Sequence, residues 1–155
     1  MEIAFYKGPG DIVTFLIRKI TRSSYSHAKI RFFDGLVFQA SGRKPAGISL
    51  RPWKEETKCY WDAVKIPLTF DEELSVLRYS QKFIGGRFSW RGVFRFLFPW
   101  MAEDEDGWYC TELIVHILQE TLGMLRDVHV ELTPQELYEK LLTCSRSRDT
   151  MMYRY

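Results

Sequence analysis

The sequence lacks a regular pattern of cysteines. It has three in 155 residues, namely Cys59, Cys110 and Cys144. An odd number without regular spacing argues against a disulfide framework and favours a reducing compartment. There is also no Cys-x-x-Cys pair and no Cys/His cluster with zinc-ligand spacing. We therefore expect a chain stabilised by its hydrophobic core, with no metal and no other cofactor.

Long apolar runs and blocks of like charge are also missing. No stretch reaches the roughly 18 apolar residues of a membrane-spanning helix. The N-terminus lacks the basic segment and apolar region of a signal peptide. The net charge is only +2, and the basic residues are interspersed with acidic ones, which argues against nucleic-acid binding. These absences predict a soluble, cytoplasmic protein, with release by lysis as the alternative; the oligomeric state is left open.

The residues that are present predict one globular domain. Hydrophobic residues make up 46% and aromatic residues 15% of the chain, which is enough for a sizeable core at this length. We place the domain at 1–144 and a polar C-terminal tail at 145–155.

The order of hydrophobic patterns predicts an α+β fold. Alternating or β-branched segments predict strands at 27–33, 36–41, 48–53 and 59–66, with a tight turn at Asp34-Gly35. Helical periodicity predicts helices within 12–20, from Thr69 or Asp71 to about 84, over 110–122, and from Pro134 through 142. Strands linked by hairpins and followed by helices indicate an antiparallel sheet packed against helices.

Cys110 begins the clearest of these helices, directly after an acidic, glycine-containing loop. The first amides of a helix and its dipole favour a negative charge, so a thiolate is stabilised there. His27 begins a predicted strand after a short polar loop, and an imidazole next to the thiol would accept its proton. His116 is a rival partner, but it lies about 120° from the Cys110 face of the helix. His129 lies in a predicted loop and is a weaker rival.

Gln39 is the candidate for orienting the imidazole. A hairpin that turns at Asp34-Gly35 brings residues 36–41 beside 27–33, which places Gln39 near the His27 end. Its amide oxygen can accept a hydrogen bond from the second ring nitrogen. Ser41 is smaller, and Asp34 lies in the turn itself, so both are poorer choices.

Four segments carry a family resemblance. They are Gly10-Asp11-Ile12-Val13, Tyr25-Ser26-His27-Ala28-Lys29-Ile30, Val37-Phe38-Gln39-Ala40 with Gly47-Ile48, and Tyr109-Cys110-Thr111-Glu112-Leu113-Ile114. In this order they resemble the circularly permuted branch of the NlpC-type, papain-like cysteine hydrolases, most closely the YiiX-like group. Segments 86–92 and 132–137 extend the resemblance.

The resemblance implies a papain-like site, with Cys110 as nucleophile, His27 as general base and Gln39 as the orienting residue. It implies amidase, peptidase or acyl-transfer chemistry on a peptide, peptidoglycan fragment or acyl substrate. For the oxyanion or substrate we consider the Cys110 N–H together with Tyr25, Tyr6 and Tyr109. Gln39 stands where the family usually has an acid, Thr111 replaces serine, and Ser89 stands where aspartate is usual.

Three functions follow from this pattern. The first is a hydrolase that cleaves an amide bond through a Cys110 thioester. The second is an acyltransferase or lipid-directed thiol enzyme, which the aromatic segment 88–100 suggests. The third is a non-catalytic binding or inhibitor protein that retains the fold. We expect the acidic segment 103–106 to be a solvated loop that disfavours anionic substrates near Cys110.

Overall fold

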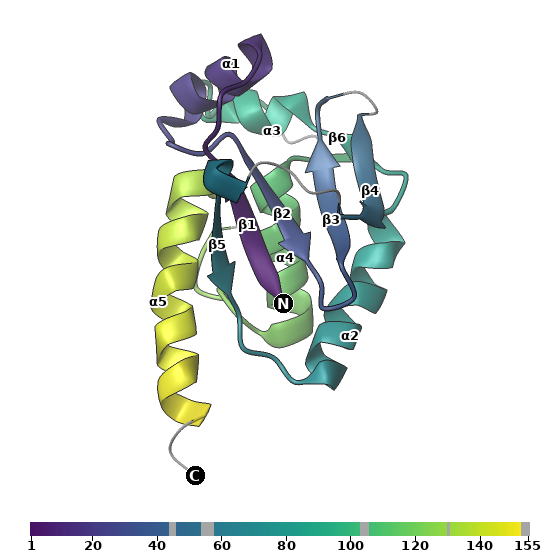
Figure 1. Ribbon diagram of the computed structural model, residues 1–155. Helices are drawn as coiled ribbons and strands as arrows, with labels where there is room; N and C mark the ends of the chain where they lie inside the picture. The colour runs from purple at the N-terminus through teal and green to yellow at the C-terminus, as the bar shows by residue number, and fades with distance from the viewer. Residues whose placement is uncertain (44–45, 54–57, 103–105, 130, 153–155) are drawn as a thin grey trace.

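A five-stranded antiparallel sheet forms the centre of the protein. The computed structural model describes residues 1–43, 46–53, 58–102, 106–129 and 131–152, with side chains described as far as 144 apart from that of residue 58. The strands are β1 (Glu2–Tyr6), β2 (His27–Arg31), β3 (Leu36–Ser41), β4 (Gly47–Pro52) and β5 (Trp61–Lys65). They lie in the order β4-β3-β2-β1-β5 (Figure 1). A short parallel pair joins β6 (Arg87–Phe88) to β7 (Gly107–Trp108).

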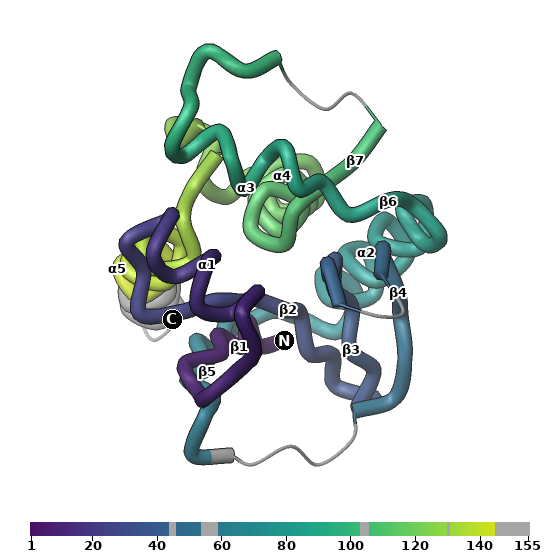
Figure 2. Tube along the Cα trace, turned by 90° about the horizontal axis from the view of Figure 1, so that it is seen from above, coloured from purple at the N-terminus to yellow at the C-terminus, as the bar shows by residue number. Residues whose placement is uncertain are grey.

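Helices cover one face and one end of this sheet. Helix α4 (Cys110–Leu122) lies behind the central strands, between α2 (Phe70–Ser80) and α5 (Pro134–Met152). Viewed from above, the strands form one layer and α4 lies on a single side of it (Figure 2). The short helices α1 (Ile12–Thr21) and α3 (Trp90–Arg95) lie at the end of the sheet where α4 begins. Two 3-10 turns, at Lys58–Tyr60 and Gln81–Phe83, complete the elements. In the described part of the chain, no helix combines the length and the apolar character needed to cross a bilayer.

The core lies between the sheet and α4. The strand side chains that face the helix include Ile3, Phe5, Ala28, Ile30 and Phe38, all fully buried. The helix contributes Leu113, Ile114, Ile117 and Leu118 at 1% exposure or less, which is the apolar stripe that the sequence predicts. Because each such side chain contributes about 1.5–3 kcal/mol when buried, this contact fixes the position of α4 against the sheet.

Strands β2 and β3 part at the end where α4 begins. Their paired positions are Ile30–Phe38 and Arg31–Val37, whereas β3 and β4 pair over six positions. Figure 1 shows β2 and β3 diverging toward α1. The start of β2 and the first turn of α4 are therefore neighbours at an open end of the sheet.

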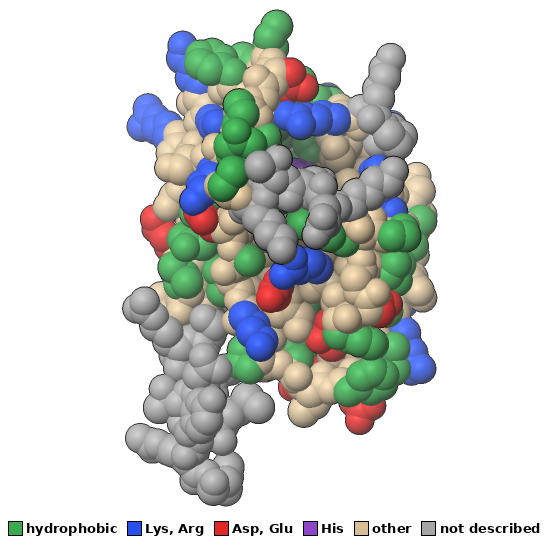
Figure 3. All heavy atoms as spheres, viewed as in Figure 1, with side chains coloured by type: hydrophobic (Ala, Val, Ile, Leu, Met, Phe, Trp, Pro, Cys, Tyr) green, Lys and Arg blue, Asp and Glu red, His purple; other side chains and the backbone are tan. Residues whose placement is uncertain are grey.

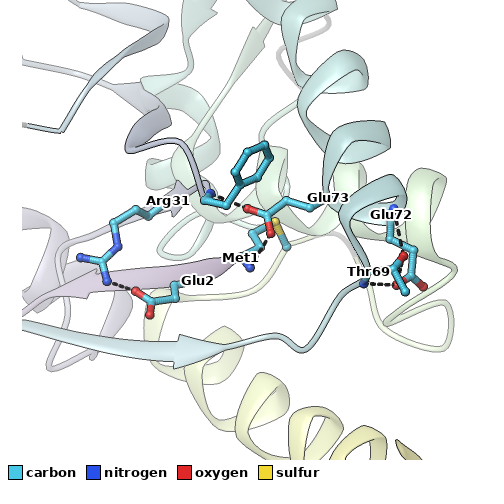
Figure 4. Close-up of polar contacts among 7 residues, drawn as sticks. Met1, Glu2, Arg31, Thr69, Glu72 and Glu73 are labelled. Carbon is cyan, nitrogen blue, oxygen red and sulfur yellow. Dashed lines mark hydrogen bonds and ion pairs between the residues drawn. The ribbon is translucent and has the colours of Figure 1, made fainter.

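The opposite end of the sheet is closed by a polar cluster (Figure 4). The Met1 ammonium group binds the Glu73 carboxylate at 2.8 Å, and the Phe33 N–H donates to the same carboxylate at 2.7 Å. Thr69 caps α2 through a capping box with Glu72. These contacts tie β1, the β2–β3 turn and α2 together, far from the open end.

The predicted α+β class with an antiparallel sheet is confirmed, and several boundaries differ. β1 lies between β2 and β5, and the sequence pattern does not predict it as a strand. Predicted strands 27–33 and 59–66 are shorter, because β2 ends at Arg31 and a 3-10 turn precedes β5. Residues 145–152, expected in a loose tail, continue α5, which ends at Met152.

Candidate active site

Cys110 is the first residue of α4, and its side chain is 4% exposed. Glu112 accepts a hydrogen bond from the Tyr109 N–H at 3.2 Å, which helps to set the start of the helix. The backbone N–H groups of Ala28, Thr111 and Cys110 all interact with the sulfur. Because Ala28 directly follows His27, the thiol lies against the start of β2.

The Cys110 thiol is protonated at neutral pH. Burial raises its pKa to about 11, although the N–H groups of Ala28, Thr111 and Cys110 act in the opposite direction. The amides at the helix start favour the thiolate, as expected, but their effect on the pKa is smaller than that of burial. Desolvation of the charged form outweighs the amides of the helix terminus.

His27 is bound to Gln39. The His27 Nε2 atom lies 3.0 Å from Gln39 Oε1, which is the contact predicted from the hairpin. Gln39 follows Phe38, the last β3 residue that pairs with β2, and it lies on the same face of the sheet as Lys29 and His27. Because an amide oxygen only accepts, Nε2 carries the proton in the neutral ring and Nδ1 keeps its lone pair.

The imidazole is neutral as well. Burial lowers the pKa of His27 to about 4, and the positive charges of Lys29, Arg43 and Arg51 act in the same direction. The hydrogen bond to Gln39 opposes them. The free protein at neutral pH therefore holds a thiol beside a neutral imidazole, which is a proton donor beside a base.

Cys110, His27 and Gln39 line one cavity of about 520 Å³. Its walls come from α1, α3, the first turn of α4 and the open face of the sheet. No hydrogen bond joins the sulfur to the ring among the described contacts. The rival histidines lie elsewhere: His116 packs against Tyr79 and Trp108, and His129 is exposed.

The three candidate tyrosines are placed differently from one another. The Tyr25 hydroxyl donates to Asp62 at 2.7 Å, and Tyr25 does not line the cavity, so its proposed role at the oxyanion is wrong. Tyr6 and Tyr109 line the cavity, but their hydroxyls donate to the carbonyl oxygens of Pro9 and Leu132. Burial raises the pKa of Tyr109, so this hydroxyl stays protonated in a structural hydrogen bond.

Ser26 is a polar residue of the site that the sequence reasoning did not select. It lines the cavity next to His27 and is 4% exposed. Its buried hydroxyl has no hydrogen-bond partner within the described residues. Because buried polar groups are nearly always paired, this hydroxyl is available to a bound molecule. A serine before the histidine was visible in the sequence, but nothing there showed that it would be buried and unpaired.

The other predicted features have local structural roles or fall outside the described residues. Ser89 caps α3 by accepting from the Gly92 N–H at 2.9 Å, and Thr111 donates to Leu132. Segment 88–100 is divided: Phe88 and Val93 line the cavity, whereas Phe94, Leu97, Phe98 and Trp100 are exposed. Of the acidic segment, residues 103–105 lie outside the described residues, and Asp106 is exposed.

The described residues do not form a metal-binding site. Within the ranges given above, no group of three or more His, Cys, Asp or Glu side chains is close enough to hold an ion. The thiol and imidazole of the cavity are instead accompanied by an amide, hydroxyls and cationic side chains.

The fold is similar to that of a known structure, whereas comparison of the sequence with family models and curated proteins gives no match. No protein-family model and no curated protein match this sequence. The fold is similar to the crystal structure of the metalloprotein YiiX from Escherichia coli O157:H7, with a TM-score of 0.55 and 20% sequence identity. The match covers 79% of this chain and 66% of that one, slightly less than two thirds of YiiX. The chain therefore has a YiiX-like α+β fold, as its sequence motifs predict.

Proposed function

We propose that this protein is a papain-like cysteine hydrolase that cleaves an amide bond in a peptide or peptidoglycan fragment. The observation that carries the proposal is that Cys110, His27 and Gln39 line one cavity, in which Gln39 Oε1 lies 3.0 Å from His27 Nε2. It brings together a nucleophile, a neutral base and a group that orients the base.

In the proposed reaction, His27 Nδ1 accepts the thiol proton while the sulfur attacks the substrate carbonyl carbon. The tetrahedral intermediate then collapses, the carbon–nitrogen bond breaks, and the imidazolium donates its proton to the leaving nitrogen. Water, deprotonated by His27, cleaves the resulting thioester and restores the thiol. Since thiol and imidazole are both neutral at rest, proton transfer accompanies the attack rather than preceding it.

The oxyanion would be held by the Cys110 N–H and the Ser26 hydroxyl. The first of these groups lies at the start of α4, where helix amides have no intrahelical partner. The second is the unpaired hydroxyl beside His27. One such donor typically contributes about 3 kcal/mol to transition-state stabilisation.

The test is turnover and trapping of the thioester. The protein is incubated with neutral 4-nitrophenyl esters and with peptide amides, and intact mass is measured after rapid acid quenching. An acyl adduct on Cys110 and a loss of about a thousandfold or more in kcat for Cys110→Ala support the proposal. Cys59→Ser is the matched control, because Cys59 is an exposed free thiol outside the cavity. Full activity in Cys110→Ala overturns the assignment.

The same measurement separates hydrolysis from acyl transfer. An acyltransferase or lipid-directed enzyme would pass the acyl group to an added amine or alcohol faster than to water. The exposed apolar residues of segment 94–100 favour that reading, because they would suit an acyl chain or lipid near the site. Product analysis with and without the acceptor decides between the two.

The raised thiol pKa favours the third candidate, a binding protein without turnover. A buried, protonated thiol is a poor nucleophile in the absence of substrate. This candidate predicts tight ligand binding with no acyl adduct on any of the three cysteines, and with equal binding by the protein and Cys110→Ala.

A further inference from the structure

The charged residues that line the cavity all carry the same sign. They are Lys29, Arg43 and Arg51, and no aspartate or glutamate of the described residues lines it. All three lower the pKa of His27, so their charges act at the reacting ring. In the space-filling view, Lys and Arg side chains border a hollow near the end of the molecule that carries α1 (Figure 3). The expectation that the acidic segment 103–106 disfavours anions near Cys110 stays a prediction, because residues 103–105 lie outside the described residues.

The three cationic side chains differ in the contacts that they already make within the protein. Arg43 binds the Asp11 carboxylate at 3.2 Å and also contacts Thr14. The Lys29 ammonium group stacks on Trp53 at 4.0 Å and on Trp61 at 3.6 Å from the ring centroids. Arg51 donates to the Ser49 hydroxyl from Nε at 3.3 Å and from Nη2 at 3.0 Å.

Arg51 has donors left for a ligand. A guanidinium group carries five N–H donors in a planar fork, and the Ser49 contacts use two of them. Within the described ranges, no carboxylate pairs with Arg51. A cationic fork that faces a cavity with three donors remaining is suited to a carboxylate or phosphate.

The sheet places Arg51 on the face that carries Gln39, level with Arg31 at the end of β2 away from His27. Arg51 pairs with Val37, and Ser49 pairs with Gln39, so Arg51 and Gln39 lie on the same face of neighbouring strands. The backbones of β4 and β2 are about 10 Å apart across the sheet, and Arg51 is also four residues along from the level of His27. The Arg51 side chain shortens this separation because it folds back to Ser49, which is level with Gln39. Because Arg51 and Cys110 line the same cavity, an acyl substrate bound there can place an anionic group at Arg51 while its carbonyl lies at Cys110.

We propose that Arg51 forms an anion-binding subsite of this cavity, which holds a carboxylate or phosphate group of the substrate while Cys110 attacks a nearby carbonyl. The subsite rests on the proposed function for its role in turnover, but its binding property does not. It narrows the substrate class to acyl compounds that carry a negative charge close to the bond that is cleaved.

The binding test uses Cys110→Ala, so it is independent of chemistry. Calorimetry measures the binding of glutarate, the carboxylate probe, and of glycerol phosphate, the phosphate probe. Glutaramide and glycerol are their neutral analogues. We expect at least one anion to bind and its neutral analogue not to bind, with the Kd rising as salt is added. The tighter of the two anions identifies the preferred group.

The variants test the residue. Adding Arg51→Gln to Cys110→Ala should weaken anion binding at least tenfold. The affinity of the Arg51→Lys variant should lie between those of Cys110→Ala and its Arg51→Gln derivative, because lysine keeps the charge but lacks the planar fork. Arg78→Gln is the matched control, since Arg78 is exposed on α2 and lies outside the cavity. Thermal unfolding confirms that Arg51→Gln is folded. Equal binding of charged and neutral probes, or unchanged anion binding in Arg51→Gln, overturns the subsite.

A kinetic measurement separates this inference from the proposed function. The ratio of kcat/KM for 4-nitrophenyl hydrogen glutarate to that for 4-nitrophenyl valerate should fall about tenfold in Arg51→Gln. If the protein shows no turnover but the anion binds through Arg51, the proposed hydrolase is wrong and the subsite stands. If turnover occurs and the ratio does not change, the subsite is wrong and the hydrolase stands.

Discussion

At the scale of single residues, the site is governed by burial rather than by the charge of a helix terminus. The amides at the start of α4 favour a thiolate, but Cys110 is too buried for them to prevail, and burial also keeps His27 neutral. A neutral pair requires that negative charge be stabilised as it forms on the substrate oxygen. The unpaired Ser26 hydroxyl therefore has the greatest mechanistic interest among the residues that the sequence reasoning missed.

Replacing Ser26 by alanine should lower activity without lowering stability. If the hydroxyl holds the oxyanion, kcat should fall about a hundredfold. Because a buried unpaired hydroxyl costs free energy, its removal should leave the free energy of unfolding unchanged or raise it by up to about 1 kcal/mol. Urea unfolding and initial rates measure the two effects. Ser24→Ala, an exposed position in the same loop, is the control. Loss of stability with unchanged kcat would show a structural role instead.

The contact between His27 and Gln39 shows how far residues could be predicted from the sequence. The Asp34-Gly35 turn and strand alternation determine the register, and the register determines which side chain reaches the ring. Tyr25 could not be placed in this way. Its hydroxyl donates to Asp62, which is 37 positions away, and no local pattern specifies that pairing.

At the scale of elements, the strong helical periodicity of hydrophobic residues predicts the helices, whereas the hydrophobic pattern of β1 is too weak to predict a strand. Helix α4 has the predicted bounds, because its apolar stripe is long and Gly123 ends it in a left-handed conformation. β1 is an interior strand, and the run from Ile3 to Tyr6 is continuously apolar or aromatic, so its sequence lacks the apolar–polar alternation that β2 shows. Its position between β2 and β5 depends on long-range pairing.

The first turn of α4 is tied to the segment before α5. Both Tyr109 and Thr111 donate to the Leu132 carbonyl oxygen. We expect Tyr109→Phe to lower the free energy of unfolding by about 1 kcal/mol, because one donor remains. Combining it with Thr111→Val should cost more than the sum of the single changes, since the carbonyl then loses both donors.

Urea unfolding of the four proteins in this cycle measures the coupling. Turnover separates this structural role of Tyr109 from a direct one at the substrate. A large loss of kcat in Tyr109→Phe, with an unchanged free energy of unfolding, would show that the Tyr109 hydroxyl acts directly on the substrate.

At the scale of the whole molecule, the two reacting groups make stability depend on pH in opposite directions. The pKa of His27 is about 4 in the folded protein and 6.5 in the unfolded reference, so the unfolded chain binds more protons between these values. Stability must therefore fall as pH is lowered from 6.5 to 4. The pKa of Cys110 is about 11 instead of 9.0, so the folded chain keeps its proton longer and stability falls as pH rises from 9 to 11.

Urea midpoints measured at pH 7, 6, 5 and 4.5 test the acid side of this prediction. Asp11 and Asp62 have pKa values lowered from 3.8, so their protonation destabilises the fold mainly below this range and equally in each variant. Replacing His27 by glutamine should flatten the decline between pH 6.5 and 4.5. Gln39→Glu should also reduce it, because a carboxylate beside the ring raises the pKa of His27 in the folded state. If His27→Gln declines as steeply as the natural protein, the ring is not the group that is desolvated on folding, and the neutral thiol–imidazole pair loses its physical basis.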